Sequence, residues 1–218
     1  MRDLPTATVR NQVLVPMRFA GGFATTARVF TFRGLVDGRE HLALGLGAHA
    51  AAVSRDAADR PPLVRLHSEC LTGDVLGSER CDCGPQLAEA VEAIADAGGF
   101  LLYLRQEGRG IGLYAKIDAY ALQDDGLDTY EANLALGYAA DARDYTPAAQ
   151  MLRALGVDRV ALLSNNPDKA AQLGAFGITV ADRMPTGVHL NPANARYLAT
   201  KAARGEHTLA LPVDVAAG

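Results

Sequence analysis

The sequence has few cysteines, no surplus of basic charge and no long hydrophobic run. Its 218 residues include three cysteines, an odd number that does not suit the paired disulfide framework of a secreted protein. The formal net charge is −4, so we expect no nucleic acid partner. No apolar run reaches membrane-spanning length, and the opening MRDLPTATVRNQ has no apolar core of a signal peptide. We therefore expect no membrane partner and a cytoplasmic location.

Short apolar or alternating runs between turn residues fill the first third of the chain and predict β-strands. These runs are VLVPMRF, ARVFTFRGL, HLALGLG and LVRLH, and residues 51–62 read as a polar loop. From Gly84 onward, helical patterns alternate with the strand patterns FLLYL and RVALLS. We predict a mixed α/β fold, in which a strand-rich N-terminal third is followed by strand–helix units around a mixed sheet.

Apolar spacing and capping residues predict the helices. They fall within residues 85–99, 114–126, 146–156, 165–177 and 191–205. Thr146, Asn166 and Asn191 are the expected N-caps, each closely followed by proline. Asp128 and Glu131 have the spacing of a capping box, which predicts a further helix start.

All three cysteines lie in HSECLTGDVLGSERCDC, residues 67–83. Cys70, Cys81 and Cys83 supply three thiolates, whereas a structural zinc site closes four positions and a catalytic site leaves one for water. We favour zinc in an open, catalytic site. Two alternatives remain: unrelated buried thiols, or a closed structural site with His67 as the fourth ligand.

A Gly-rich basic stretch, LRQEGRGIGLYAK, covers residues 104–116. Its glycines allow close backbone approach, and Arg105, Arg109 and Lys116 add positive charge, so together they could cradle phosphates. The spacing is not that of a P-loop. A second anion site is possible in LLSNNPDK, where Lys169 follows a helix start, although plain capping explains that stretch equally well.

Several motifs in order resemble the GTP cyclohydrolase II family. They are HSECLTGD, RCDCG, RQEGRGIGL, AYALQD, DTYEAN, ADARDY and LLSNNPDK, and the resemblance covers about residues 60–208. It implies a single domain over residues 1–218, with a divergent strand-rich part at 1–60 and a catalytic core at 61–208.

The resemblance also implies an activity. Members of the family open the imidazole ring of GTP, release formate and pyrophosphate, and yield 2,5-diamino-6-ribosylamino-4(3H)-pyrimidinone 5′-phosphate, in the first step of riboflavin biosynthesis. It implies one Zn²⁺ per subunit, Mg²⁺ with the triphosphate, and a homodimer.

Site residues carry over by position. Cys70, Cys81 and Cys83 would hold zinc, Asp141 would accept a proton, Arg143 would be the nucleophile at the α-phosphate, and Tyr120 would serve ring opening. The residues implied for GTP are Arg65, Leu66, His67, Ser68, Glu69, Gln86, Glu107, Gly108, Arg109, Thr129, Ser164 and Lys169. A guanidinium is a poor nucleophile, so Arg143 is also interpreted as a phosphate clamp.

Two other functions remain open. One is a specialised paralogue that stops at a formylated intermediate or serves another pathway. The other is a non-catalytic, zinc-stabilised nucleotide-binding module. The presence of Tyr120, Asp141, Arg143 and all three cysteines favours the complete reaction.

Overall fold

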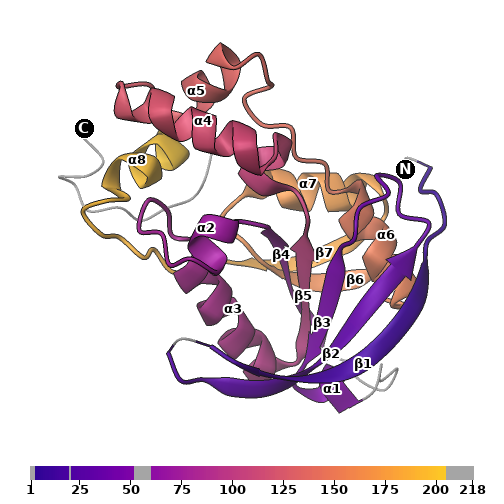
Figure 1. Ribbon diagram of the computed structural model, residues 1–218. Helices are drawn as coiled ribbons and strands as arrows, with labels where there is room; N and C mark the ends of the chain where they lie inside the picture. The colour runs from indigo at the N-terminus through magenta and orange to yellow at the C-terminus, as the bar shows by residue number, and fades with distance from the viewer. Residues whose placement is uncertain (1–2, 20, 52–59, 205–218) are drawn as a thin grey trace. The chain divides into compact units, whose positions relative to one another are not determined.

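The computed structural model describes residues 3–19, 21–51 and 60–204, and the chain forms two compact units (Figure 1). Unit 1 comprises Met1–His67, Leu87–Arg105 and Tyr145–Thr186. Unit 2 comprises Ser68–Gln86, Gln106–Asp144 and Gly187–Gly218. Each unit is described below by itself.

Unit 1 is built on a seven-stranded sheet with the strand order β1-β2-β3-β5-β4-β6-β7. The strands are β1 (Thr8–Arg18), β2 (Ala24–Arg33), β3 (Leu42–Leu46), β4 (Leu63–Ser68), β5 (Gly99–Leu104), β6 (Arg159–Leu163) and β7 (Thr179–Met184). The pairs β1–β2, β2–β3 and β3–β5 are antiparallel, whereas β4–β6 and β6–β7 are parallel. The prediction of a mixed α/β fold around a mixed sheet is confirmed.

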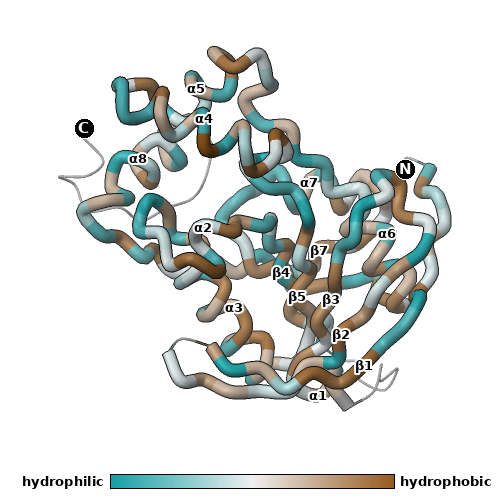
Figure 2. The backbone as a smooth tube through the Cα atoms, in the orientation of Figure 1, coloured by the Kyte–Doolittle hydropathy of each residue, from teal (hydrophilic) through white to brown (hydrophobic). Residues whose placement is uncertain are grey.

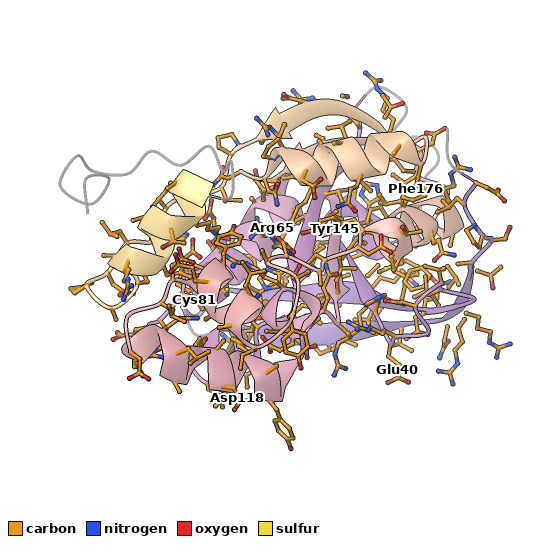
Figure 3. The ribbon with its side chains drawn as sticks, turned by 90° about the horizontal axis from the view of Figure 1, so that it is seen from above. Glu40, Arg65, Cys81, Asp118, Tyr145 and Phe176 are labelled. Carbon is orange, nitrogen blue, oxygen red and sulfur yellow. The ribbon has the colours of Figure 1, made fainter. Side chains whose placement is uncertain are left out.

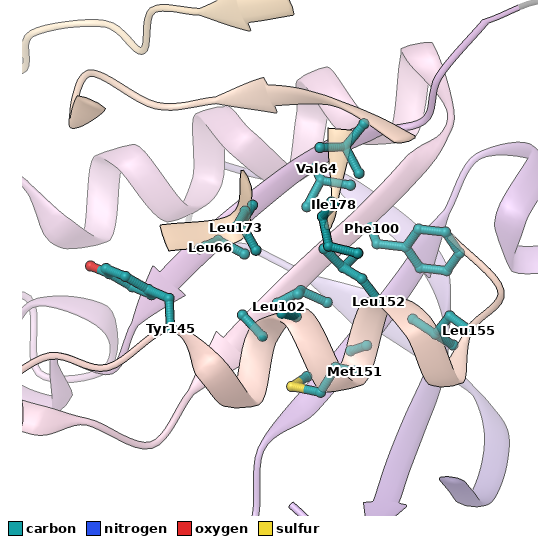
Figure 4. Close-up of a cluster of buried hydrophobic side chains, with 14 of the residues drawn as sticks. Val64, Leu66, Phe100, Leu102, Tyr145, Met151, Leu152, Leu155, Leu173 and Ile178 are labelled. Carbon is teal, nitrogen blue, oxygen red and sulfur yellow. The ribbon is translucent and has the colours of Figure 1, made fainter. Parts of the chain in front are cut away.

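Both faces of this sheet are covered, because side chains alternate along each strand. In β5, Phe100 and Leu102 join a core cluster with α6 (Thr146–Ala154) and α7 (Pro167–Ala175), as Figure 4 shows. Leu101, between them, faces the cluster formed with α3 (Cys83–Ala97). A strand buried on both faces is a continuous apolar run, and Figure 2 colours β5 as hydrophobic.

Unit 2 is mostly helical. It contains α2 (Leu71–Asp74), the 3₁₀ helix η1 (Glu107–Gly110), α4 (Leu113–Asp124), α5 (Thr129–Ala135) and α8 (Ala195–Arg204), and α3 begins in it. Helix α5 starts with the predicted capping box of Asp128 and Glu131. In the described ranges, no helix has the length and apolar composition needed to cross a bilayer.

Of the three N-caps predicted before a proline, two are wrong and one is confirmed. Asn166 caps α7 by accepting the Asp168 N–H. Thr146 is the first residue of α6 rather than its N-cap, and Tyr145 occupies the cap without a side-chain hydrogen bond. Asn191 does not cap α8, which begins at Ala195 after a turn in which Asn191 and Asn194 exchange two hydrogen bonds. Residue type favoured both caps, but Tyr145 enters α6 with its ring in the core, and Asn191 closes a turn with Asn194 instead.

Other boundaries differ in smaller ways. The short helices α1 (Ala48–Ala51) and α2 and the strand β7 were not predicted. Residues 52–59 of the predicted loop and Gly205 of the last predicted helix lie outside the described residues.

Burial favours the neutral form of His41 in unit 1. Its Nδ1 accepts the Arg105 N–H at 2.8 Å, so the other ring nitrogen, Nε2, donates to Asp37 Oδ2 at 2.9 Å. Burial lowers the pKa of His41 below its ordinary value, against the opposing hydrogen bond and charge of Asp37. The folded protein therefore takes up this proton at a lower pH than the unfolded chain.

Acidification is therefore expected to destabilise the fold through His41. The contribution is fully present above about pH 6.5, the usual histidine pKa, and is lost as the pH falls below it. A His41→Gln variant should be less stable at pH 7.5 but should lose less stability between pH 7.5 and 5.5. Urea denaturation at the two pH values measures this, and equal losses in both proteins would contradict the prediction.

Candidate functional site

The three cysteines of unit 2 converge. Their Sγ atoms all lie within 4.8 Å of one another, and those of Cys70 and Cys81 are 3.6 Å apart. Thiolates bound tetrahedrally to one metal at about 2.3 Å would lie about 3.8 Å apart. Among the described residues, no histidine or carboxylate joins the group. The donor set thus fits a metal site with three protein ligands rather than a closed site.

Local structure explains the convergence. Cys70 precedes α2, Cys83 opens α3, and the buried Gly73 lies between them in space. A Cβ on Gly73 would lie 2.8 Å from the Cys81 Sγ and 3.1 Å from the Cys70 Sγ. Only glycine leaves room there for three sulfurs. Asp74 Oδ2 accepts the Cys70 N–H at 3.0 Å and fixes the backbone.

Negative charge concentrates on Cys70. Hydrogen bonds from Cys81 and Cys83, together with the nearby Lys116, hold the pKa of Cys70 far below its ordinary value despite burial. The hydrogen bond between Cys81 and Cys70 raises the pKa of Cys81 to about 11. Of the three thiols, Cys70 therefore loses its proton most readily, and its sulfur lies beside the Lys116 ammonium.

Polar side chains lie around the Cys70 sulfur. The Lys116 Nζ lies 3.1 Å from the Cys70 Sγ, although the sequence had placed Lys116 with the phosphate-binding charges. The Thr72 hydroxyl lies 3.3 Å from the Tyr120 hydroxyl. Burial raises the pKa of Tyr120, so its phenol stays protonated at neutral pH and can donate. Arg80 stacks over the Tyr120 ring, with Cζ 4.8 Å from its centroid.

The Gly-rich turn and the ADARD segment lie side by side in unit 2. The Ala142 N–H donates to the Arg109 carbonyl at 3.1 Å. Gly110 has φ +96°, and a Cβ there would lie 3.0 Å from the Ala142 carbonyl oxygen. Arg109 itself has φ +60° and is the one described non-glycine residue with positive φ. Such backbone conformations cluster at functional sites.

The Arg109 side chain is only partly satisfied by the protein. Its guanidinium stacks over the Tyr130 ring, 4.1 Å from the centroid. Its Nη1 is buried without a hydrogen-bond acceptor among the described residues. A buried unpaired donor costs free energy, so an anionic ligand would stabilise this turn.

Asp141 and Arg143 form an ion pair. Arg143 Nε donates to both carboxylate oxygens, at 2.9 and 3.0 Å, and Arg143 Nη2 also contacts Oδ2. Burial would raise the pKa of Asp141, but the hydrogen bonds and charge of Arg143 outweigh it and hold that pKa below its ordinary value. Asp141 is thus an ionised carboxylate that orients the guanidinium.

The remaining predicted residues of unit 2 occupy different places. Thr129 is the first residue of α5 and lines a polar cavity. Buried Gln86 donates to Asp82 Oδ2 at 2.6 Å. Ser68 Oγ accepts a hydrogen bond from Gln106 at 3.0 Å, and Glu69 is half-buried.

In unit 1, the predicted residues cluster around the end of β4. Lys169 Nζ donates to the Leu66 carbonyl at 2.8 Å, and the Leu66 side chain belongs to the core. Arg65 Nη1 donates to the Leu163 carbonyl at 3.4 Å, and the Arg65 side chain can be seen in Figure 3. His67 stacks on Tyr103 with ring centroids 5.6 Å apart. Ser164 Oγ accepts the Asn166 N–H at 3.0 Å.

Sequence reasoning missed a buried carboxylate between two of the thiols. Asp82 is 1% exposed, and its second oxygen lies 3.5 Å from Lys201 Nζ on α8. The signal was weak, because Lys201 is 119 residues away along the chain.

The profile of the family described as GTP cyclohydrolase II matches residues 9–185. The chain belongs to the GTP cyclohydrolase II family. A GTP cyclohydrolase-2 of Vibrio vulnificus is 50% identical over 183 residues, which cover 84% of this chain and 89% of the relative. One of Pseudomonas aeruginosa is 55% identical over 185 residues, covering 83% and 86%. One of Psychromonas ingrahamii is 46% identical over 198 residues, covering 91% and 96%.

The family match covers residues 9–185 and so leaves out the last helix. It includes the N-terminal strands β1 to β3, where the motifs had given little signal. It ends at residue 185, so α8, which carries Lys201, lies beyond the matched part of this family member.

A Gly73→Ala variant is expected to bind metal at least about tenfold more weakly, because the added methyl group would press on two of the three sulfurs. The backbone at Gly73 is not in the left-handed region, so the fold should survive. Competition with a chromophoric chelator measures the affinity, and circular dichroism checks the fold. Glu79→Gln, at an exposed position of the loop between Cys70 and Cys81, is the control and should leave the affinity unchanged. Unchanged affinity in Gly73→Ala would contradict the steric argument.

Proposed function

We propose that this protein is a GTP cyclohydrolase II that catalyses the complete reaction. It would open the imidazole ring of GTP hydrolytically, release C8 as formate, release pyrophosphate, and leave 2,5-diamino-6-ribosylamino-4(3H)-pyrimidinone 5′-phosphate. The observation that carries the proposal is the three-thiol group beside a protonated tyrosine, in a chain that belongs to this family.

We propose that Cys70, Cys81 and Cys83 hold one Zn²⁺ per subunit. The spacing of their sulfurs and the room left by Gly73 support this assignment. Bound zinc supplies Lewis-acid activation of water at neutral pH. The chain's own contribution is to hold the thiolates and to move protons, and Tyr120 is the proposed donor to the departing ring nitrogen.

Charge neutralisation of the triphosphate is the proposed role of the Gly-rich turn. The unpaired Arg109 Nη1 and the strained backbone beside it support an anion site there. Glu107 is engaged within the protein, so the turn would contribute its backbone N–H groups and Arg109. Mg²⁺ is proposed to accompany the triphosphate.

Arg143 is proposed to contact the α-phosphate, with Asp141 as its partner. The lowered pKa of Asp141 makes it a weak base, so the pair supports an oriented phosphate clamp better than proton transfer from the guanidinium. We further propose that GTP contacts Arg65, Leu66, His67, Ser68, Glu69, Gln86, Gly108, Thr129, Ser164 and Lys169. Leu66 would contribute its main chain, because its side chain lies in the core.

We also propose that the protein serves riboflavin biosynthesis in the cytoplasm as a homodimer. Mass spectrometry of the products formed from GTP with zinc and magnesium tests the function. A diaminopyrimidinone monophosphate with formate and pyrophosphate is the expected result. A product that keeps the formyl group would indicate the specialised paralogue. Unchanged GTP with zinc-loaded protein would indicate the binding module, and either outcome would overturn the proposal.

A further inference from the structure

The ammonium group of Lys116 is fully engaged inside unit 2. Lys116 lies in the first turns of α4, and its side chain is 11% exposed. Its Nζ lies 3.1 Å from Cys70 Sγ, 3.0 Å from Thr72 Oγ1 and 2.7 Å from Glu107 Oε1. An ammonium has three N–H donors, and here three acceptors surround it. Its charge is therefore directed at the thiols rather than at a phosphate.

Glu107 completes this arrangement from the other side of Cys70. Its side chain is 8% exposed. One carboxylate oxygen accepts from Lys116 and from the Gly108 N–H at 3.0 Å, and the other accepts the Leu71 N–H at 2.7 Å. The ion pair thus contacts the Cys70 sulfur at one end and the backbone directly after Cys70 at the other. Loss of one partner would leave a buried charge unpaired.

Lys116 also connects the thiols to Tyr120. The two residues are four apart on α4, so their side chains lie on one face of the helix. Lys116 donates to the Thr72 hydroxyl oxygen, and that oxygen lies 3.3 Å from the Tyr120 oxygen. The ammonium therefore occupies one lone pair of the Thr72 oxygen, and the remaining contacts of this hydroxyl are with Tyr120 and with the Cys70 sulfur, 3.7 Å away.

The charge balance of the thiol group calls for such a cation. Three thiolates around one divalent ion carry a net charge of about −1. A hydrogen bond from a cation to one sulfur offsets that charge and orients the ligand, as outer partners of metal ligands generally do.

We propose that Lys116 is a positioning residue of the metal centre. With Glu107 it holds Cys70 in the arrangement that binds metal, and through Thr72 it orients the hydroxyl of Tyr120. The link to Tyr120 rests on the proposed function, whereas the hold on Cys70 is testable by metal binding alone.

The first test measures metal binding. Zn²⁺ affinity, from competition with a chromophoric chelator, is expected to fall about 10- to 100-fold in Lys116→Met and to recover in part in Lys116→Arg. In the Co²⁺-substituted protein, the thiolate-to-cobalt absorption is expected to shift in Lys116→Met, because a hydrogen bond to sulfur is lost. The matched control is Asp118→Asn, which should change neither readout. Asp118 lies at an exposed position of the same helix and is labelled in Figure 3.

Folded Lys116→Met protein with wild-type zinc affinity and an unshifted cobalt spectrum would overturn the proposal. If Lys116→Met does not fold, the zinc affinity of Lys116→Gln decides, because glutamine keeps a hydrogen-bond donor and removes the charge. If the unmodified protein turns over GTP and Lys116→Met keeps its zinc affinity and cobalt spectrum, this inference is rejected and the proposed function stands. If Lys116→Met loses zinc affinity but the unmodified protein does not act on GTP, the hold of Lys116 on Cys70 stands and the proposed function is rejected.

The second test examines the link to Tyr120. Thr72→Val removes the hydroxyl but keeps its volume and leaves the contact of Lys116 with Cys70. The kcat for formate release, measured with saturating zinc, is expected to fall about tenfold or more with KM unchanged. Thr72 also contacts the Cys70 sulfur at 3.7 Å, so zinc affinity is expected to fall less than in Lys116→Met. An unchanged kcat, or a change confined to KM, would overturn the link.

Discussion

Replacing Cys81 by serine is expected to abolish zinc binding and formate release together. A serine hydroxyl does not ionise near neutral pH, so the site would keep two thiolates and lose its open three-ligand arrangement. Loss of a ligand should exceed the 10- to 100-fold effects of outer-shell changes, so we expect zinc affinity to fall by more than about a hundredfold. Zinc content by elemental analysis and formate release from GTP measure the two effects.

The matched control for this prediction is Glu79→Gln in the same loop, whose side chain is exposed. It should keep both zinc and activity. A Cys81→Ser protein that lost zinc but still released formate would contradict the metal-dependent chemistry. One that kept zinc would contradict the assignment of Cys81 as a ligand.

Replacing Gly99 by alanine is expected to destabilise unit 1 by about 3 kcal/mol or more. Gly99 begins β5, and a Cβ there would lie 2.0 Å from the Leu63 carbonyl oxygen of β4. That atom belongs to the backbone of a neighbouring strand in the sheet order, so it can move aside only if the pairing is disturbed. Urea denaturation followed by circular dichroism measures the loss.

Gly174→Ala is the matched control. Gly174 lies inside α7, and a Cβ there would meet nothing within 4 Å. Alanine is the better helix former, so this variant should gain about 0.5–1 kcal/mol. Equal urea midpoints for the two variants would contradict the argument that the close approach of β4 and β5 excludes a side chain at position 99.

Much of the secondary structure followed from local pattern. Apolar residues at helical spacing, among them Leu87, Val91 and Ile94, predicted the helix α3. These side chains belong to the same cluster as residues of the sheet. The cap of Asn166 was equally local, since the bond spans two residues. Thr146 shows the limit: its type favours a cap, but the entry of the chain into α6 is fixed by Tyr145, whose ring lies in the core. Capping preference is worth about 1 kcal/mol, and burial of an aromatic ring is worth more.

By itself, the sequence indicated the candidate metal ligands and the motifs. Three cysteines in one short stretch, a Gly-rich basic turn and the ADARD segment were visible as residue types at short spacing. Only the tertiary structure decided which charge serves which group. It directed Lys116 to Cys70 across 46 residues, brought Lys201 within 3.5 Å of Asp82, and laid the Arg109 turn against Ala142. Local spacing reports which groups are available, whereas buried charges find their partners through packing between segments that are distant in the chain.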